Sequence, residues 1–230
     1  MSIVGETLMP RLNVIAQPAA FFLFPVLFMV LTTPLVHPSL AGTVEEEIRG
    51  LADAATRWRL VHLGLTIGSI LGGLTVVSLG RVVGGRLWSV AGRAASAVGV
   101  VSALVLVGVF LQEAIMVPSL AKACARVETC LAPENRLFFQ EFARLGWQEV
   151  PYLGWGGIGL TGSLLVVGLL GWRAGNLRFW EALPLVLGCA RIILTEPSLH
   201  GNAIFGFIGI LVGLGFYAVR MVRPLLGPIR

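Results

Sequence analysis

Residues 94–117 read AASAVGVVSALVLVGVFLQEAIMV, and this stretch holds no charged side chain before Glu113. A helix that crosses a membrane needs about 20 mostly apolar residues to span about 30 Å of hydrocarbon. The run is long enough to do so. It therefore predicts a transmembrane helix, and the rest of the chain extends the same pattern in both directions.

The composition of the whole chain favours the same class. Its 230 residues are 56% hydrophobic and 13% charged, and the mean hydropathy is +0.87. Soluble domains carry about 25% charged residues, so this chain cannot form an ordinary polar surface. These values exclude a disordered protein, a nucleic-acid reader and an ordinary soluble enzyme. They predict an all-α, polytopic integral membrane protein.

Six apolar segments are candidate spans, and together they predict one transmembrane domain over residues 1–230. They cover residues 14–36, 60–80, 94–117, 152–172, 182–195 and 202–219. The fifth segment is short and is followed by a turn at residues 196–201, so the fifth and sixth are expected to form a helical hairpin. A cleavable signal peptide is the rival interpretation of the first segment. Its apolar run is longer than a typical signal core, and we therefore treat it as a span.

The basic residues predict which side each loop faces. One set of connections carries nine arginines against two acids, Glu6 and Glu181. These arginines are Arg11, Arg81, Arg86, Arg93, Arg173, Arg178, Arg220, Arg223 and Arg230. In the opposite set, basic residues are offset by a larger number of acids. Because short cytoplasmic loops are enriched in Lys and Arg, both termini are expected in the cytoplasm, with the large loops outside a cell membrane. The Arg-rich composition is typical of a prokaryotic source.

The two large loops, at residues 37–59 and 118–151, are expected on the outer face. Thr43 followed by three glutamates is typical of a helix start. Farther on, Leu137, Phe138, Phe142 and Leu145 recur at helical spacing. They predict an amphipathic helix in the membrane interface, either a lid on the bundle or a docking surface for a membrane-protein partner. Cys124 and Cys130 share the second loop and predict a disulfide, since this loop would face an oxidising compartment.

Glycines recur at four-residue spacing within the spans. Gly64, Gly68 and Gly72 form one such series, and Gly209 and Gly213 form another. Small residues at this spacing let transmembrane helices approach closely. They predict tight packing within the bundle, and the pattern is also compatible with self-association. Pro25 is expected to kink the first span.

Ionisable residues inside spans are expensive and therefore informative. The main candidates for a ligand or cofactor site are His62, Glu113, Arg191 and His200, and the secondary candidates are His37, Gln112 and Glu196. All seven fall in the outer half of the membrane under the predicted topology. They predict a shared polar pocket that opens outward. Because Glu113 and Arg191 have opposite charge and similar depth, we expect them to pair directly or through a water molecule.

Four chemical interpretations fit these residues. The first is a non-catalytic binding or accessory subunit that holds a hydrophobic ligand or cofactor, and we favour it because it requires no special chemistry. The second is a redox protein with b-type haem or quinone, in which His62 and His200 ligate iron and Arg191 pairs with a propionate. The third is an intramembrane metal enzyme, although no metal-binding spacing is present. The fourth is a small transporter, against which the nearly apolar inner half argues.

Overall fold

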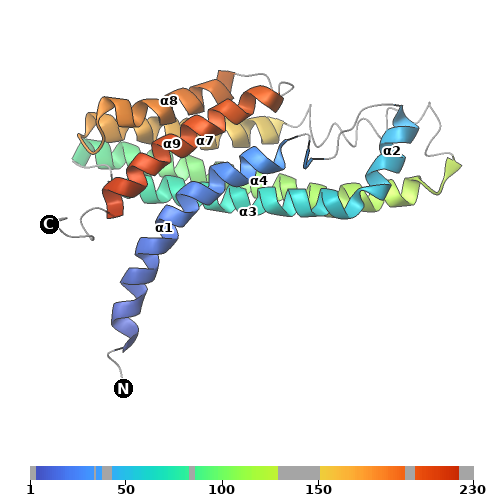
Figure 1. The fold of residues 1–230 in the computed structure, drawn as a ribbon, viewed down its shortest axis with the longest axis horizontal. Helices are drawn as coiled ribbons and strands as arrows, with labels where there is room; N and C mark the ends of the chain where they lie inside the picture. Colours follow the sequence, from blue (N-terminus) through green and yellow to red (C-terminus); the bar gives the residue numbers. More distant parts are fainter. Residues whose placement is uncertain are drawn as a thin grey trace.

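A computed structural model of the chain describes residues 4–33, 35–37, 43–82, 86–128, 151–194 and 200–222. Seven helices occupy these residues, and no strand occurs among them (Figure 1). They are α1 (Val4–Leu31), α2 (Val44–Asp53), α3 (Ala55–Val82), α4 (Arg86–Cys124), α7 (Pro151–Arg173), α8 (Phe179–Leu194) and α9 (His200–Val222). The predicted all-α class is confirmed for this part of the chain.

Three of these helices are long and apolar enough to cross a membrane. The qualifying segments are Ala55–Arg81 in α3, Val90–Cys124 in α4 and Gly154–Arg173 in α7. Pro18–Leu31 and Ile204–Arg220 are shorter apolar helices within α1 and α9. Large apolar side chains such as Leu104, Leu74 and Phe205 lie exposed on the bundle surface. A surface of this kind suits lipid, and the chain is therefore a membrane protein.

The arrangement is built around a long antiparallel pair formed by α3 and α4 (Figure 1). Helices α7, α8 and α9 lie together alongside one part of this pair. Helix α2 packs at its other end, which we call the α2 end of the bundle. Helix α1 contacts α3 and α9, while its N-terminal part extends away from the other helices.

The first glycine series forms the groove on α3 that receives α1. A Cβ atom at Gly64 would lie 2.5 Å from Leu31, and one at Gly68 would lie 2.9 Å from Phe28. Gly72 faces Phe24 in the same way, at 2.9 Å. Leu31, Phe28 and Phe24 lie about one helical turn apart and therefore fill successive gaps left by the glycines. The predicted role of this series in close packing is confirmed.

The second glycine series joins α8 to α9 almost backbone to backbone. A Cβ atom at Gly188 would lie 2.5 Å from the Gly206 carbonyl oxygen, and one at Gly209 would lie 2.8 Å from the Pro184 carbonyl oxygen. At the far end of this contact, Arg220 pairs with Glu181 at 2.9 Å. The Arg178 backbone amide also donates to the Glu181 carboxylate, at 2.8 Å. The expected hairpin is thus held by a close contact between glycines and by an ion pair.

Helix α2 begins where the sequence predicts a helix start. The Thr43 hydroxyl accepts a hydrogen bond from the Glu46 amide, and the Glu46 carboxylate accepts one from the Thr43 amide at 2.8 Å. This reciprocal capping box satisfies amides that have no partner within the helix. It lowers the pKa of Glu46. The opposite face of α2 buries Ile48 and Leu51 against Trp58 and the end of α4.

Several boundaries differ from the predicted ones. Helix α1 ends at Leu31 rather than 36, since the chain turns at Thr32 and Thr33 ahead of Pro34, and proline disfavours helix at the residue before it. Helix α4 continues through Pro118 to Cys124, well past 117. The predicted interfacial helix near residues 137–147 and Cys130 lie outside the described residues. The disulfide from Cys124 to Cys130 therefore stays a prediction.

Candidate functional site

The structure brings two of the predicted site residues into direct contact. His62 of α3 and Glu113 of α4 approach to 2.7 Å between Nε2 and Oε2. The exposed fraction is 0% for His62 and 3% for Glu113. The contact lies between the two helices that form the central pair of the bundle. It joins an imidazole to a carboxyl group inside an apolar surrounding.

The other ring nitrogen of His62 also has a partner in the protein. His62 Nδ1 lies 2.9 Å from the Trp58 carbonyl oxygen. A carbonyl oxygen only accepts, so Nδ1 carries hydrogen and donates. Nε2 is then the ring nitrogen that faces the Glu113 carboxyl group.

The contact at Glu113 leaves hydrogen-bonding capacity unused. The distance to His62 is that of an ion pair, but its angles are not those of a hydrogen bond. Both carboxyl oxygens of Glu113 are buried and have no hydrogen-bond partner among the described residues. Buried polar atoms without partners are uncommon in native structures and often mark functional sites. This carboxyl group can therefore form a hydrogen bond with a group outside the described part of the chain.

Trp58 holds the pair in place, and sequence reasoning missed it. Its ring stacks on His62 with centroids 4.4 Å apart and planes at 25°. Its indole Nε1 donates to the Glu113 carbonyl oxygen at 3.2 Å. Trp58 is thus linked to both partners from α3 alone. Its position four residues before His62, on the same helix face, is the signal that could have identified it.

His37 joins this group from the segment that follows α1. Its ring centroid lies 5.0 Å from that of Trp58 and 5.3 Å from that of His62. Arg57 fixes the backbone just before it, because its Nε donates to the Val36 carbonyl oxygen and its Nη2 to that of Leu35, both at 2.6 Å. We call His37, Trp58, His62 and Glu113 the histidine cluster.

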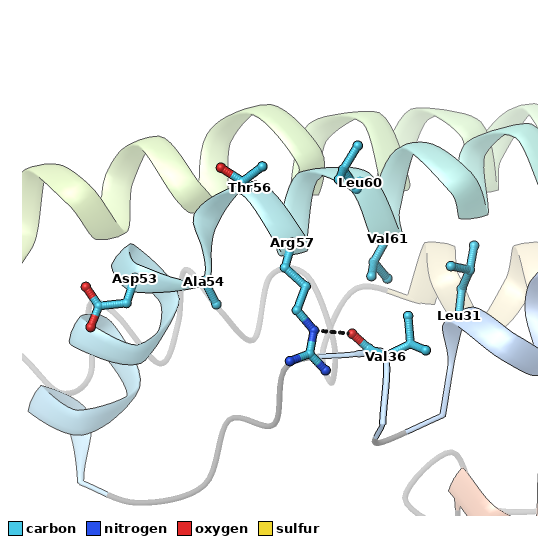
Figure 2. A pocket seen from close by; sticks show the side chains of 8 residues that line it. All are labelled: Leu31, Val36, Asp53, Ala54, Thr56, Arg57, Leu60 and Val61. Atoms are coloured by element: carbon cyan, nitrogen blue, oxygen red, sulfur yellow. Dashed lines mark hydrogen bonds between the residues drawn. The ribbon is translucent and has the colours of Figure 1, made fainter.

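A pocket of about 540 Å³ adjoins the histidine cluster at the α2 end of the bundle. Its lining residues are Leu31, Val36, Asp53, Ala54, Thr56, Arg57, Leu60 and Val61. Figure 2 shows these side chains around the junction between α2 and α3, with Arg57 reaching across to Val36. Val36 and Val61 directly precede His37 and His62 in the chain. The wall of the pocket and the cluster are thus built from the same two segments.

The remaining predicted site residues do not join the cluster. Arg191 lies exposed on α8, with its guanidinium 5.6 Å from the ring centroid of Phe205. The expected pairing of Glu113 with Arg191 is wrong, because His62 on the neighbouring helix α3 takes that place. Gln112 is exposed on α4. His200 begins α9, but its side chain and the whole of Glu196 lie outside the described residues.

The geometry bears on the cofactor hypotheses. Both ring nitrogens of His62 face protein atoms, so an iron bond from His62 requires loss of the Trp58 or Glu113 contact. For metals, no group of three His, Cys, Asp or Glu side chains in the described part of the chain is placed to hold an ion. The cluster places an imidazole beside a carboxyl group whose oxygens have no hydrogen-bond partner among the described residues. This chemistry suits a ligand that forms hydrogen bonds.

No protein family model matches the chain, and neither curated proteins nor solved structures show a significant similarity to it.

Proposed function

We propose that this chain is a six-span protein of a cell membrane that binds a hydrophobic ligand at its outer face, as a binding or accessory subunit of a membrane complex. In this proposal α1, α3, α4, α7, α8 and α9 are the spans, and the α2 end of the bundle faces outward. The apolar surface of the helices supports the membrane setting.

The charge at the helix ends supports this orientation. Helices α3, α7 and α9 each carry an arginine in the last turn, namely Arg81, Arg173 and Arg220. In the antiparallel arrangement these ends lie away from α2, whose first turn carries three glutamates. Basic residues favour the cytoplasmic side. Both termini are then cytoplasmic.

The observation that carries the proposed function is the pocket beside a fully buried polar pair. Ligand sites are mostly apolar concavities with a few convergent polar groups. The pocket has five apolar lining side chains, Leu31, Val36, Ala54, Leu60 and Val61, together with Asp53, Thr56 and Arg57. Two of these residues, Val36 and Val61, directly precede His37 and His62 of the histidine cluster. A ligand with an apolar body and a polar head group matches this distribution.

Quinone binding is the second candidate, and the His62–Glu113 contact favours it. A quinone head group carries carbonyl oxygens that accept hydrogen bonds and an apolar ring and tail that suit the pocket. The pair places an imidazole beside a buried carboxyl group whose oxygens have no hydrogen-bond partner among the described residues. This candidate requires the head group to pass the wall formed by Val36 and Val61.

Filling the pocket tests the proposed function. Leu60 lines the pocket and is 65% exposed, so Leu60→Trp reduces the free volume without overfilling the core. Leu63→Trp is the matched control, because Leu63 is an exposed leucine on the same helix outside the pocket. The measurements are native mass spectrometry and an absorption spectrum of the detergent-purified protein.

The expected result is a bound mass that Leu60→Trp removes and Leu63→Trp retains. A bound mass unaffected by Leu60→Trp, or no bound mass at all, would contradict ligand binding at this pocket. A quinone spectrum or mass lost in Glu113→Gln would favour the second candidate. Partner proteins that co-purify through the outer loops would support the accessory role.

A further inference from the structure

Two opposite charges line the pocket and do not pair with each other. Asp53 ends α2 and Arg57 lies in the first turn of α3, four residues later. In a continuous helix this spacing allows an ion pair. Here the helix breaks at Ala54, and neither side chain forms an ion pair with any described residue. Figure 2 shows the Asp53 carboxylate directed away from the Arg57 guanidinium.

Arg57 keeps part of its guanidinium available. Its two hydrogen bonds to the Leu35 and Val36 carbonyl oxygens use Nε and Nη2. They position the side chain but leave its charge without a neutralising carboxylate among the described residues. The Nη1 amino group also has no partner there. A held guanidinium with free donors suits a phosphate, which accepts hydrogen bonds from the planar group.

The apolar part of the pocket lies directly beside this arginine. Leu60 and Val61 follow Arg57 within about one helical turn, and Leu31 of α1 completes the wall. Polar and charged lining residues thus lie toward α2, and aliphatic ones lie toward the body of the bundle. An amphiphile with a charged head and an aliphatic chain has its charged and apolar parts in the same order as the lining of the pocket.

We propose that the pocket holds a zwitterionic phospholipid of the surrounding membrane, with its phosphate at Arg57, its ammonium group toward Asp53 and an acyl chain along Leu60, Val61 and Leu31. This proposal rests on the proposed function, because it names the ligand of the same pocket. Asp53 disfavours a purely anionic head group by charge repulsion. A zwitterion satisfies both charges at once.

The test is a lipid titration of the purified full-length protein by native mass spectrometry. The probes are phosphatidylethanolamine, phosphatidylglycerol and inorganic phosphate. We expect the wild-type protein to bind the ethanolamine lipid in preference to the glycerol lipid, and to show no binding of phosphate alone. Arg57→Gln should weaken binding of both lipids roughly tenfold, the scale of one charge-assisted hydrogen bond.

Asp53→Asn separates head-group recognition from pocket filling. It should abolish the preference for the ethanolamine lipid while retaining binding of the glycerol lipid, and it leaves the Arg57 hydrogen bonds intact. Arg59→Gln and Glu45→Gln are the matched controls, because each removes an exposed charge of the same sign from the same helix outside the pocket. Both controls should behave as wild type.

Three results would overturn this proposal. One is equal binding of both lipids by the wild-type protein, and another is an unchanged preference in Asp53→Asn. The third is a bound quinone in place of phospholipid. If Leu60→Trp still blocks lipid binding while Asp53→Asn and Arg57→Gln have no effect, the proposed function stands and only the head-group assignment fails. If Leu60→Trp has no effect either, both fail.

Discussion

The α3–α4 pair and the α8–α9 hairpin solve the same packing problem with different residues. Both join antiparallel helices. At the α2 end, α3 meets α4 through Trp58, His62 and Glu113, with a ring stack at 4.4 Å and an ion-pair contact at 2.7 Å. In the hairpin, Gly188 and Gly209 bring the backbones together so closely that a Cβ atom added at Gly209 would lie 2.9 Å from the Gly188 Cα. Only the first contact buries its titratable groups fully between the helices, since the Glu181–Arg220 pair of the hairpin is partly exposed.

The α8–α9 glycine contact stabilises the fold, whereas the α3–α4 contact also presents groups that can interact with a ligand. Glycine packing depends on shape alone and offers no group to a ligand. The histidine cluster depends on complementary charge and protonation, and it contains buried carboxyl oxygens with no hydrogen-bond partner among the described residues. The two regions should therefore respond differently to substitutions that conserve size, charge or neither.

The largest expected effect comes from removing one half of the buried pair. His62→Ala leaves Glu113 buried without its partner and opens a cavity beside Trp58. We expect a loss of about 3–5 kcal/mol in the free energy of unfolding. Unfolding in mixed micelles, followed by circular dichroism, measures this loss.

Glu113→Gln is the size-conserving comparison. Glutamine is neutral and can still bond to His62, so we expect a loss of about 1 kcal/mol. If His62→Ala cost no more than Glu113→Gln, the pair would not be a stabilising contact of the central helices.

The next effect is expected in the glycine contact. Gly188→Ala places a Cβ atom against the Gly206 carbonyl oxygen and the Ile210 amide, so α8 and α9 must separate. Overpacking of this kind costs about 1–3 kcal/mol. The same unfolding assay applies.

The control for Gly188→Ala is Gly108→Ala in α4, where an added Cβ atom meets nothing within 4 Å. Alanine favours helix over glycine by up to about 1 kcal/mol, so this variant should be neutral or more stable. Equal effects at both positions would show that the hairpin does not depend on close backbone approach.

A smaller effect is expected for Trp58→Phe. Phenylalanine can still stack on His62 but cannot donate to the Glu113 carbonyl oxygen. Losing one such hydrogen bond costs about 1 kcal/mol. Trp155→Phe is the control, because Trp155 is 69% exposed. A stability change in the control equal to that in Trp58→Phe would argue against a specific role for the indole donor.

The smallest effect is a pH dependence at the start of α2. The capping box lowers the pKa of Glu46 below its usual value of 4.5. A lowered folded-state pKa adds stability above the unfolded-state pKa, and that stability is lost as the pH falls through the folded-state value. The hydrogen-exchange protection factors of α2 amides should therefore fall below pH 4.5. Glu46→Gln should remove this dependence, whereas Glu45→Gln should not.

The sequence predicts those features that depend on one helix at a time. The Thr43 cap, the glycine series of α3 and the burial of His62 and Glu113 each follow from local pattern and span depth. The spans themselves were predicted from hydropathy, but only three of the described helices meet the length and composition of a membrane span. Helix α8 has 16 residues and carries Glu181 and Arg191.

Features that depend on which helices are neighbours could not be predicted. Depth places Glu113 and Arg191 at similar levels, but it does not say that α3, rather than α8, faces Glu113. Rotation about the helix axis places His62 inward and Arg191 outward. The role of Trp58 depends both on which helix lies next to α3 and on the rotation of α3 about its axis. The same holds for the pocket formed where α1 ends beside the α2–α3 junction.

Each helix of the α3–α4 hairpin carries one half of the buried pair, and residues 83–85 join them. The ribosome releases α3 first, with an imidazole that can enter lipid uncharged. Helix α4 follows with Glu113, and a lone charged side chain costs up to roughly 3 kcal/mol at the centre of a span, and less toward its end, during translocon-mediated insertion. His62 removes that cost if it is already in place. We therefore expect α4 to enter the bilayer more readily when α3 has entered before it.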